Sequence, residues 1–438
     1  MAARSARHLS TLILVAAAMA GCAQAPATRG SPAHFDPATL AKGAELSALG
    51  DCRGCHTVDG AAAFAGGRPL TTPFGTLYST NITPHAETGI GRWSLDDFRR
   101  ALHEGIDREG HRLYPAFPYD HFTRMTDADI DALYAFIMTR EPAKARAPRN
   151  HLVFPANVRP LLVLWDALFL DDRRYAPDAT QNAQWNRGAY LVEGVGHCGA
   201  CHTPRNIAGA EKRSDRFAGG EAEGWHAPAL GTRSSAPIPW TSDALFHYLR
   251  HGFDPDHGLA AGPMSEVIDG LGTVPEDDVR AIVAYLTSLP AQSPPNARDT
   301  VAAAEQREFD AAGHHARDRA SETGASAAKT QDAGEAIFEG ACAICHYAGN
   351  ALPAQKPVPL ALATSVNATT PRDVVRIVAN GLHPEPGESG VIMPGFRDAL
   401  TDAQLIAVVE YVRARFSDRT PWSDVESTVR GVTQETSP

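Results

Sequence analysis

The sequence predicts an all-α protein made of three tandem domains, and three observations carry this prediction. The pentapeptide Cys-x-x-Cys-His occurs three times in 438 residues, beginning at Cys52, Cys198 and Cys342. Each copy follows a short helical pattern, and each is followed further on by a longer apolar helical pattern. A chain of this length also fits about three domains of ordinary size.

The three pentapeptides have the spacing that attaches haem c covalently. Two thiols three positions apart can bind the two vinyl groups of one porphyrin, and the following imidazole meets the iron from one face. A thioredoxin-like redox pair does not need the histidine, and a zinc site usually combines two such pairs close together. We therefore expect three haem c groups, held by Cys52, Cys55 and His56, by Cys198, Cys201 and His202, and by Cys342, Cys345 and His346.

The charge of the chain gives evidence about its possible partners. Lys and Arg total 40 and Asp and Glu total 51, which gives a net charge of −11. An acidic chain of this kind does not favour binding to nucleic acid. Six of the seven cysteines belong to the three motifs, and the seventh is Cys22.

The N-terminus is typical of an exported bacterial protein. Two arginines precede an apolar run, 12–20, that is too short to cross a bilayer and resembles a signal peptide, for which we expect residues 1–21. Small residues before Cys22 resemble the site at which bacterial lipoproteins are lipidated. The alternative is ordinary cleavage after Ala20 or Ala25, which would release a soluble protein. We expect a lipid anchor at Cys22 and a location on the periplasmic side of the inner membrane.

Helices are expected at corresponding places in the three domains. One begins near Gly43, Gly188 and Gly334 and leads into each motif. Another closes each domain and carries Phe136, Tyr285 or Tyr411 at one repeat position, where we expect core packing against the first helix.

An internal helix is repeated as well. The segment 93–105 aligns without gaps on 240–252, and a third copy spans 371–381. Ser94 and Thr241 would cap the first two copies, and glycine would end all three.

These patterns define the expected organisation along the chain. We expect a signal peptide at 1–21, a tether at 22–36, a first domain at 37–147, a connector at 148–180, a second domain at 181–290, a flexible linker at 291–329, a third domain at 330–417 and a tail at 418–438.

A methionine commonly binds haem c iron opposite the histidine. Met264 follows Gly252 by 12 residues, and Met393 follows Gly381 by the same interval, with proline beside each methionine. In the first domain the same interval from the helix end leads to Phe117, which cannot bind iron. Three alternatives remain there: a ligand from His121, a ligand from Met125, or five-coordinate iron.

Several longer motifs resemble one family. They are Asn81 to Pro84, Thr88 to Ser94, Trp185 to Asn206 and Gly262 to Val267. They resemble the three-haem cytochrome c subunit of bacterial membrane-bound dehydrogenases, over about 37–290 and 330–428. The family is known from alcohol and gluconate dehydrogenases and from molybdenum hydroxylases of the nicotinate type. The family usually has methionine at the position of Phe117, and the phenylalanine here looks more like the molybdenum-hydroxylase branch.

The resemblance implies three cytochrome c domains in an electron-transfer subunit without substrate chemistry of its own. Its partners would be a catalytic dehydrogenase subunit of quinoprotein, flavoprotein or molybdopterin type, and ubiquinone, a terminal oxidase or another cytochrome as acceptor. Two other functions stay open: a peroxidase-like enzyme that uses an open first haem, and a soluble electron shuttle.

Overall fold

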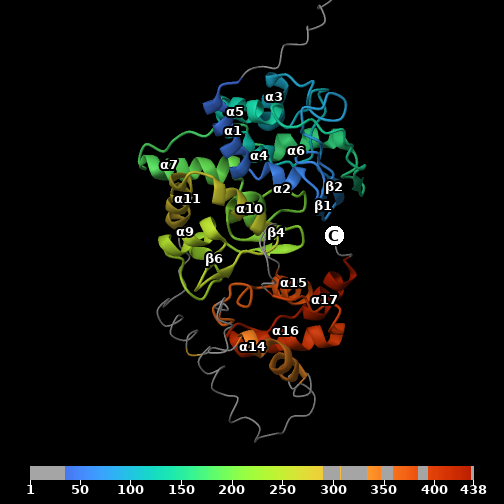
Figure 1. The fold of residues 1–438 in the computed structure, drawn as a ribbon, viewed down its shortest axis with the longest axis vertical. Coiled ribbons are helices and arrows are strands. Elements are labelled where there is room, and N and C mark those ends of the chain that lie inside the picture. The colour runs from blue at the N-terminus through green and yellow to red at the C-terminus, as the bar shows by residue number, and fades with distance from the viewer. Residues whose placement is uncertain (1–34, 290–305, 307–332, 347–358, 383–392, 436–438) are drawn as a thin grey trace, which may run out of the picture. The chain divides into compact units, whose positions relative to one another are not determined.

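The computed structural model describes residues 35–289, 306, 333–346, 359–382 and 393–435 (Figure 1). The expected signal peptide, Cys22 and most of the expected linker at 291–329 lie outside these residues. The described residues from Ala38 onward belong to one compact unit. Helices dominate the part that is described, in agreement with the expected all-α class.

The first motif lies in a helical segment with a small sheet. The helices are α1 (Pro37–Leu49), α2 (Cys52–His56), α3 (Leu95–Glu104), α4 (Tyr119–Phe122) and α5 (Asp127–Met138). The sheet has the order β1-β2-β3 and consists of β1 (Pro69–Thr72), β2 (Gly75–Tyr78) and β3 (His151–Leu152), all antiparallel.

The expected connector, 148–180, is not a plain linker. It contains β3, a 3-10 turn η1 (Arg159–Leu161) and the helix α6 (Leu162–Phe169). The inner face of α6 packs through Trp165 beside Tyr119, and their ring centroids are 6.1 Å apart. Tyr119 also donates a hydrogen bond of 2.6 Å to the Asp166 carboxylate.

The second motif lies in a segment with two β-hairpins, one formed by β4 and β5 and the other by β6 and β7. The elements of this segment are α7 (Ala183–Tyr190), the π-helix η2 (Leu191–Val195), α8 (Gly199–His202), η3 (Arg213–Asp215), β4 (Gly220–Ala222), β5 (Trp225–Ala227), η4 (Gly231–Arg233), α9 (Ser242–His251), β6 (Phe253–Asp254), β7 (Gly258–Leu259), α10 (Pro263–Thr273) and α11 (Glu276–Ser288).

The third motif follows helical residues 333–337. Its elements are the π-helix η7 (Phe338–Cys342), α14 (Ala343–His346), α15 (Arg372–Asn380), α16 (Asp402–Phe416) and α17 (Val425–Gln434). The helix α17 lies in the expected tail, and its buried Val429 and Val432 join the core of this segment.

The internal helices begin and end as the sequence predicts. Ser94 accepts a hydrogen bond from the backbone N–H of Asp97 at the start of α3, and Thr241 accepts one from Ala244 at the start of α9. Gly105 and Gly252 end these helices with φ of 64° and 71°, a conformation that glycine adopts without strain.

The short strands are the departure from the expected all-helical plan. Each is only two to four residues long, so none presents the alternating pattern from which a strand is predicted. Gly75, the first residue of β2, adopts φ of 113°, and β3 approaches it so closely that a methyl group there would lie 2.1 Å from the carbonyl oxygen of His151.

Two large hydrophobic clusters hold the described residues together. One combines side chains around the first two motifs, including Leu46, Leu133, Leu191 and Val279. The other surrounds the third motif and includes Phe338 and Val408. The first two motifs therefore share a single core, which periodicity alone does not reveal.

Candidate haem sites

The first motif occupies the short helix α2. Asp51 caps it in a left-handed conformation, with φ of 43°, and its side chain accepts a hydrogen bond of 3.1 Å from the N–H of Gly54. The ring nitrogen Nδ1 of His56 lies 2.6 Å from the carbonyl oxygen of Thr80. A loop far along the chain thus fixes the orientation of the motif histidine.

The second motif repeats this arrangement. Cys198 precedes α8, and the Nδ1 of His202 lies 2.6 Å from the carbonyl oxygen of Pro228. The β4–β5 hairpin packs against the motif, because a methyl group on Gly220 would lie 2.4 Å from the carbonyl oxygen of Cys201.

These contacts determine the tautomer of both histidines. A carbonyl oxygen only accepts, so Nδ1 must carry the proton and donate it. The neutral ring then keeps its lone pair on Nε2, the form in which imidazole binds a metal. His56 and His202 therefore have the hydrogen-bonded arrangement that an iron ligand needs.

The third motif begins at Cys342, the last residue of the π-helix η7, and continues through α14. The Nδ1 of His346 is buried and has no hydrogen-bond partner among the described residues, which omit 347–358. The second motif follows a π-helix, η2. Such a turn shifts the helix register at or just before the first cysteine.

One cavity of about 1420 Å³ joins the second and third motifs. Its walls are largely apolar, as a porphyrin site requires. Met264 and Met393, the two methionines predicted as iron ligands, also line it. The motif side chains on its wall are Cys198, Cys201, His202, Cys342, Cys345 and His346. The residues present therefore fit two haem groups at this place.

The thiols differ from those of a redox-active pair. Burial raises the pKa of Cys52 and of Cys198 to about 12, and that of Cys342 to about 11. Reactive cysteines need a lowered pKa that favours the thiolate. The structure gives these cysteines the apolar surroundings that porphyrin attachment requires.

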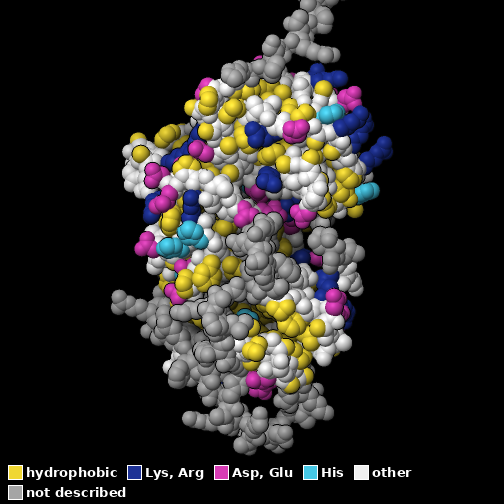
Figure 2. Space-filling model, viewed as in Figure 1, with side chains coloured by type: hydrophobic (Ala, Val, Ile, Leu, Met, Phe, Trp, Pro, Cys, Tyr) yellow, Lys and Arg dark blue, Asp and Glu magenta, His cyan; other side chains and the backbone are white. Residues whose placement is uncertain are grey.

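Acidic side chains gather beside the first motif, between α2 and β4 (Figure 2). Arg68 pairs with Glu223 at 2.8 Å and with Glu266 at 2.5 Å, and it donates a 2.8 Å hydrogen bond to the carbonyl oxygen of Gly54. Burial, and then repulsion from Glu266, raises the pKa of Asp51 to about 7. This arginine links the first motif to two acids of the second segment, and no sequence pattern pointed to it.

His121, one of the alternatives for the first iron, makes a hydrogen bond with each ring nitrogen. Its Nδ1 lies 3.0 Å from the carbonyl oxygen of Glu193, and its Nε2 lies 2.6 Å from Glu211. Both nitrogens are thus occupied. A methyl group on Gly199 would lie 3.0 Å from the His121 ring, so this histidine contacts the second motif instead.

Met125, the other possible ligand, and Phe117 both lie in apolar surroundings. Met125 is fully buried in the core shared by the first two segments. Phe117 packs against Phe122, with ring centroids 5.3 Å apart. Cys22, the predicted lipidation site, lies outside the described residues.

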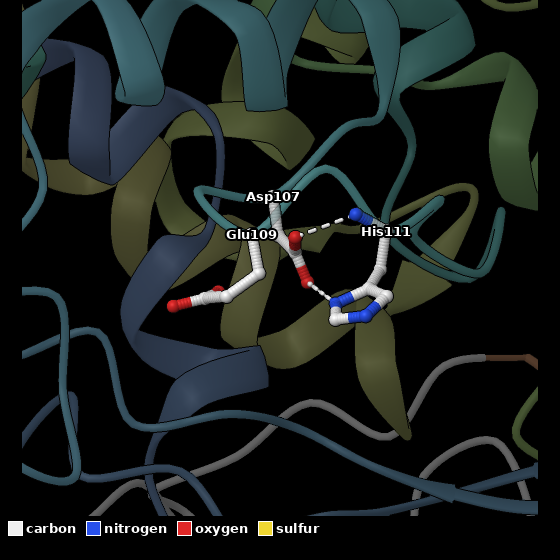
Figure 3. A group of neighbouring side chains, drawn as sticks. All are labelled: Asp107, Glu109 and His111. Carbon is white, nitrogen blue, oxygen red and sulfur yellow. Dashed lines mark hydrogen bonds and ion pairs between the residues drawn. The ribbon is translucent and has the colours of Figure 1, made fainter. Parts of the chain in front are cut away.

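Two groups of carboxylates and histidines lie outside the motifs, within the residues described. Asp107, Glu109 and His111 occupy a surface loop in which His111 donates its backbone N–H to Asp107 at 2.8 Å (Figure 3). The other group contains Asp120, His121 and Glu211. Within these groups, hydrogen bonds join Asp107 to His111 and His121 to Glu211.

The helical segments, the paired cysteines and the oriented histidines define a c-type cytochrome. Family models agree: "Cytochrome c" matches residues 40–141, and "Cytochrome C oxidase, cbb3-type, subunit III" matches residues 329–412.

Two relatives of similar length show which kind of c-type cytochrome this chain resembles. The fructose dehydrogenase cytochrome subunit of Gluconobacter japonicus is 35% identical over 94% of this chain and 86% of its own. The gluconate 2-dehydrogenase cytochrome c subunit of Pantoea cypripedii is 36% identical over 87% and 86%. The chain belongs to this family of cytochrome c subunits of dehydrogenases.

A third relative is much longer than this chain. It is a nicotinate dehydrogenase subunit of Pseudomonas putida that is 45% identical over 92% of this chain, but the match spans only 32% of the relative.

Among the described residues, no helix combines the length and the apolar character needed to cross a bilayer.

Proposed function

We propose that this chain is an electron-transfer subunit that carries three haem c groups in three tandem cytochrome c domains, 37–147, 181–290 and 330–417. The covalent attachments are Cys52 and Cys55, Cys198 and Cys201, and Cys342 and Cys345. The iron ligands are His56, His202 and His346, with Met264 and Met393 opposite the last two.

The observation that carries this proposal is the pair of 2.6 Å contacts from His56 and His202 to backbone carbonyl oxygens. A dithiol pair does not need this orientation of the imidazole, and a zinc site usually combines two cysteine pairs close together, whereas each motif here has one. Haem c, when bound, supplies a one-electron couple. The chain's own residues hold the porphyrin, fix the imidazole tautomer and exclude water through the apolar cavity wall.

The electrons would come from a catalytic dehydrogenase subunit of quinoprotein, flavoprotein or molybdopterin type. The higher identity to the nicotinate dehydrogenase relative favours the molybdopterin type. The acceptor would be ubiquinone, a terminal oxidase or another cytochrome. A lipid at Cys22 would hold the subunit on the periplasmic side of the inner membrane.

The test begins with isolation of this chain from bacterial membranes together with the subunits that accompany it. Fructose, gluconate, an alcohol or nicotinate is then added without oxygen, and haem absorption is followed. We expect one substrate to reduce the haems of the complex, but none to reduce the isolated chain. Reduction or turnover by the isolated chain would contradict the proposal.

The hydrogen bonds at both ring nitrogens of His121 favour a second function, because an imidazole held in this way does not bind iron. An open first haem would suit a peroxidase-like enzyme. Hydrogen peroxide turnover by the isolated chain at enzymatic rates would favour this alternative. Peroxide inertness, with substrate reduction through a partner, would exclude it.

A further inference from the structure

The helix α6 and its neighbouring loops carry an exposed apolar surface. Eight of the eleven large apolar side chains that are most exposed in the described residues lie here. We call them the α6 patch: Val153, Phe154, Val158, Leu161, Val163, Leu164, Leu168 and Ile207. Ile207 belongs to it because Trp165 of α6 donates a 3.0 Å hydrogen bond to the carbonyl oxygen of Ala208.

The helix α6 is apolar on both faces. Trp165 and the partly buried Phe169 face the small cluster around Tyr119, while Leu164 and Leu168 point outward and are 60% and 62% exposed. A helix that is apolar all round needs an apolar environment on both sides. With eight residues it cannot span a bilayer, so its outer face needs a surface to cover it.

The charge around the α6 patch is positive although the whole chain is acidic. Residues 144–174 contain six cations and three acids, Asp166, Asp171 and Asp172. Asp166 is buried and pairs with Arg112 at 2.7 Å, and Asp171 pairs with Arg173 at 2.6 Å. The four other cations in this range that precede α6 are Lys144, Arg146, Arg149 and Arg159. Arg213 adds a further cation at the end of α6, where it donates to the carbonyl oxygen of Phe169 at 2.7 Å.

We infer that the α6 patch docks on a lipid bilayer that contains anionic headgroups. The inference rests on the proposed location of this subunit at the membrane. Apolar side chains enter the boundary between headgroups and acyl chains, and the surrounding arginines lie at the level of the phosphates. An anionic bilayer would otherwise repel a chain with a net charge of −11.

The shape of the α6 patch favours lipid over a protein partner. Phe154 is 79% exposed and Ile207 is 98% exposed, and they project from two separate loops. Side chains at such loop tips can bury their apolar surface in the fluid boundary of a lipid bilayer, which does not need a preformed pocket for each one. A protein partner would need a pocket for each tip and acidic groups opposite the arginines.

The test uses the full haem-loaded chain with Cys22→Ser, which removes the acyl chains, and its N-terminus is checked by mass. Co-sedimentation is measured with vesicles of phosphatidylcholine alone and of phosphatidylcholine with phosphatidylglycerol. We expect binding to the anionic vesicles that weakens as salt is added. Absence of binding, or equal binding to both vesicle types, would overturn the inference.

Variants then locate the contact. In this background Leu164→Glu with Leu168→Glu should weaken vesicle binding about tenfold or more. Arg146→Gln or Arg149→Gln should each weaken it about fivefold. The matched control, Ser423→Glu with Gln434→Glu, adds the same charge at exposed positions elsewhere and should bind as the parent does.

Two further readouts keep the outcomes distinct. Phe154→Ser changes only an exposed loop tip and should weaken vesicle binding even if the double variant fails to fold. Haem reduction by the catalytic partner in solution should be unchanged in every patch variant. If these variants keep vesicle binding and lose the catalytic partner, the α6 patch is a protein interface and the inference is wrong.

Discussion

Gly188 of α7 lies directly against the backbone of Ala281 in α11: a methyl group on Gly188 would lie 1.9 Å from the carbonyl oxygen of Ala281. The same contact joins Gly43 to Ala132 at 2.1 Å and Gly334 to Ala407 at 2.3 Å. One helix crossing thus accompanies each motif. It brings the helix before the cysteines against the helix that closes the segment.

Substitution of this glycine should destabilise the crossing. Gly188→Ala forces α7 away from α11, and we expect the free energy of unfolding to fall by about 1–3 kcal/mol. Gly431→Ala in α17 is the control, because nothing lies within 4 Å of the added methyl group. That variant should keep or slightly raise stability. Denaturant unfolding of the haem-loaded protein measures both, and equal effects would contradict the close contact.

Arg68 should contribute more to stability than an exposed arginine with similar ion pairing. Arg68→Gln leaves Glu223 and Glu266 without their shared cation, and we expect a loss of about 1–3 kcal/mol. Arg173→Gln is the control, because Arg173 pairs with Asp171 at 2.6 Å but its side chain is 82% exposed. Its loss should cost less than about 1 kcal/mol. Equal losses in denaturant unfolding would show that the Arg68 cluster has no special role.

Met264 and Met393 should each affect one haem. Met264→Ala or Met393→Ala should shift one iron toward five-coordinate or water-ligated character and change its potential. Met138→Leu provides the control, because Met138 packs against the core of the first two segments. Absorption spectra and redox titration give the readout. A variant whose spectra and titration match the parent removes that methionine from the ligand set.

The sequence predicts much of this arrangement because repeated, local features carry it. The motifs and the capping of α3 and α9 depend on residues close together in the chain. The packing of Phe136, Tyr285 and Tyr411 against the first helices joins distant residues, but their shared repeat position predicts it. Gly43, Gly188 and Gly334 reveal the crossing because only glycine permits that approach.

Other features depend on contacts between distant residues. The carbonyl oxygens of Thr80 and Pro228 have no sequence signature, and neither does the pairing of Arg68 with Glu223. The location of His121 could not be predicted, because its partner Glu211 lies 90 positions further on. The sequence predicts only a connector where the structure has α6, because a short apolar run is typical of both a buried helix and a surface helix.

The first haem should differ from the other two. Both nitrogens of His121 are engaged and Met125 is buried in the core, so we expect high-spin iron whose signal shifts with cyanide. His121→Ala should leave that signal in place, as read by low-temperature electron paramagnetic resonance. A bis-histidine signal lost in His121→Ala, or a methionine-type signal lost in Met125→Ala, would contradict this expectation.

The haem count tests the central claim most directly. The intact mass of the mature protein should exceed that of its polypeptide, with any lipid counted, by three haem masses. The variant Cys342→Ser with Cys345→Ser should lose one of them, because the third motif then has no thiol left for attachment. A fully matured protein with two haem masses or fewer would contradict the proposal that each Cys-x-x-Cys-His motif holds one haem.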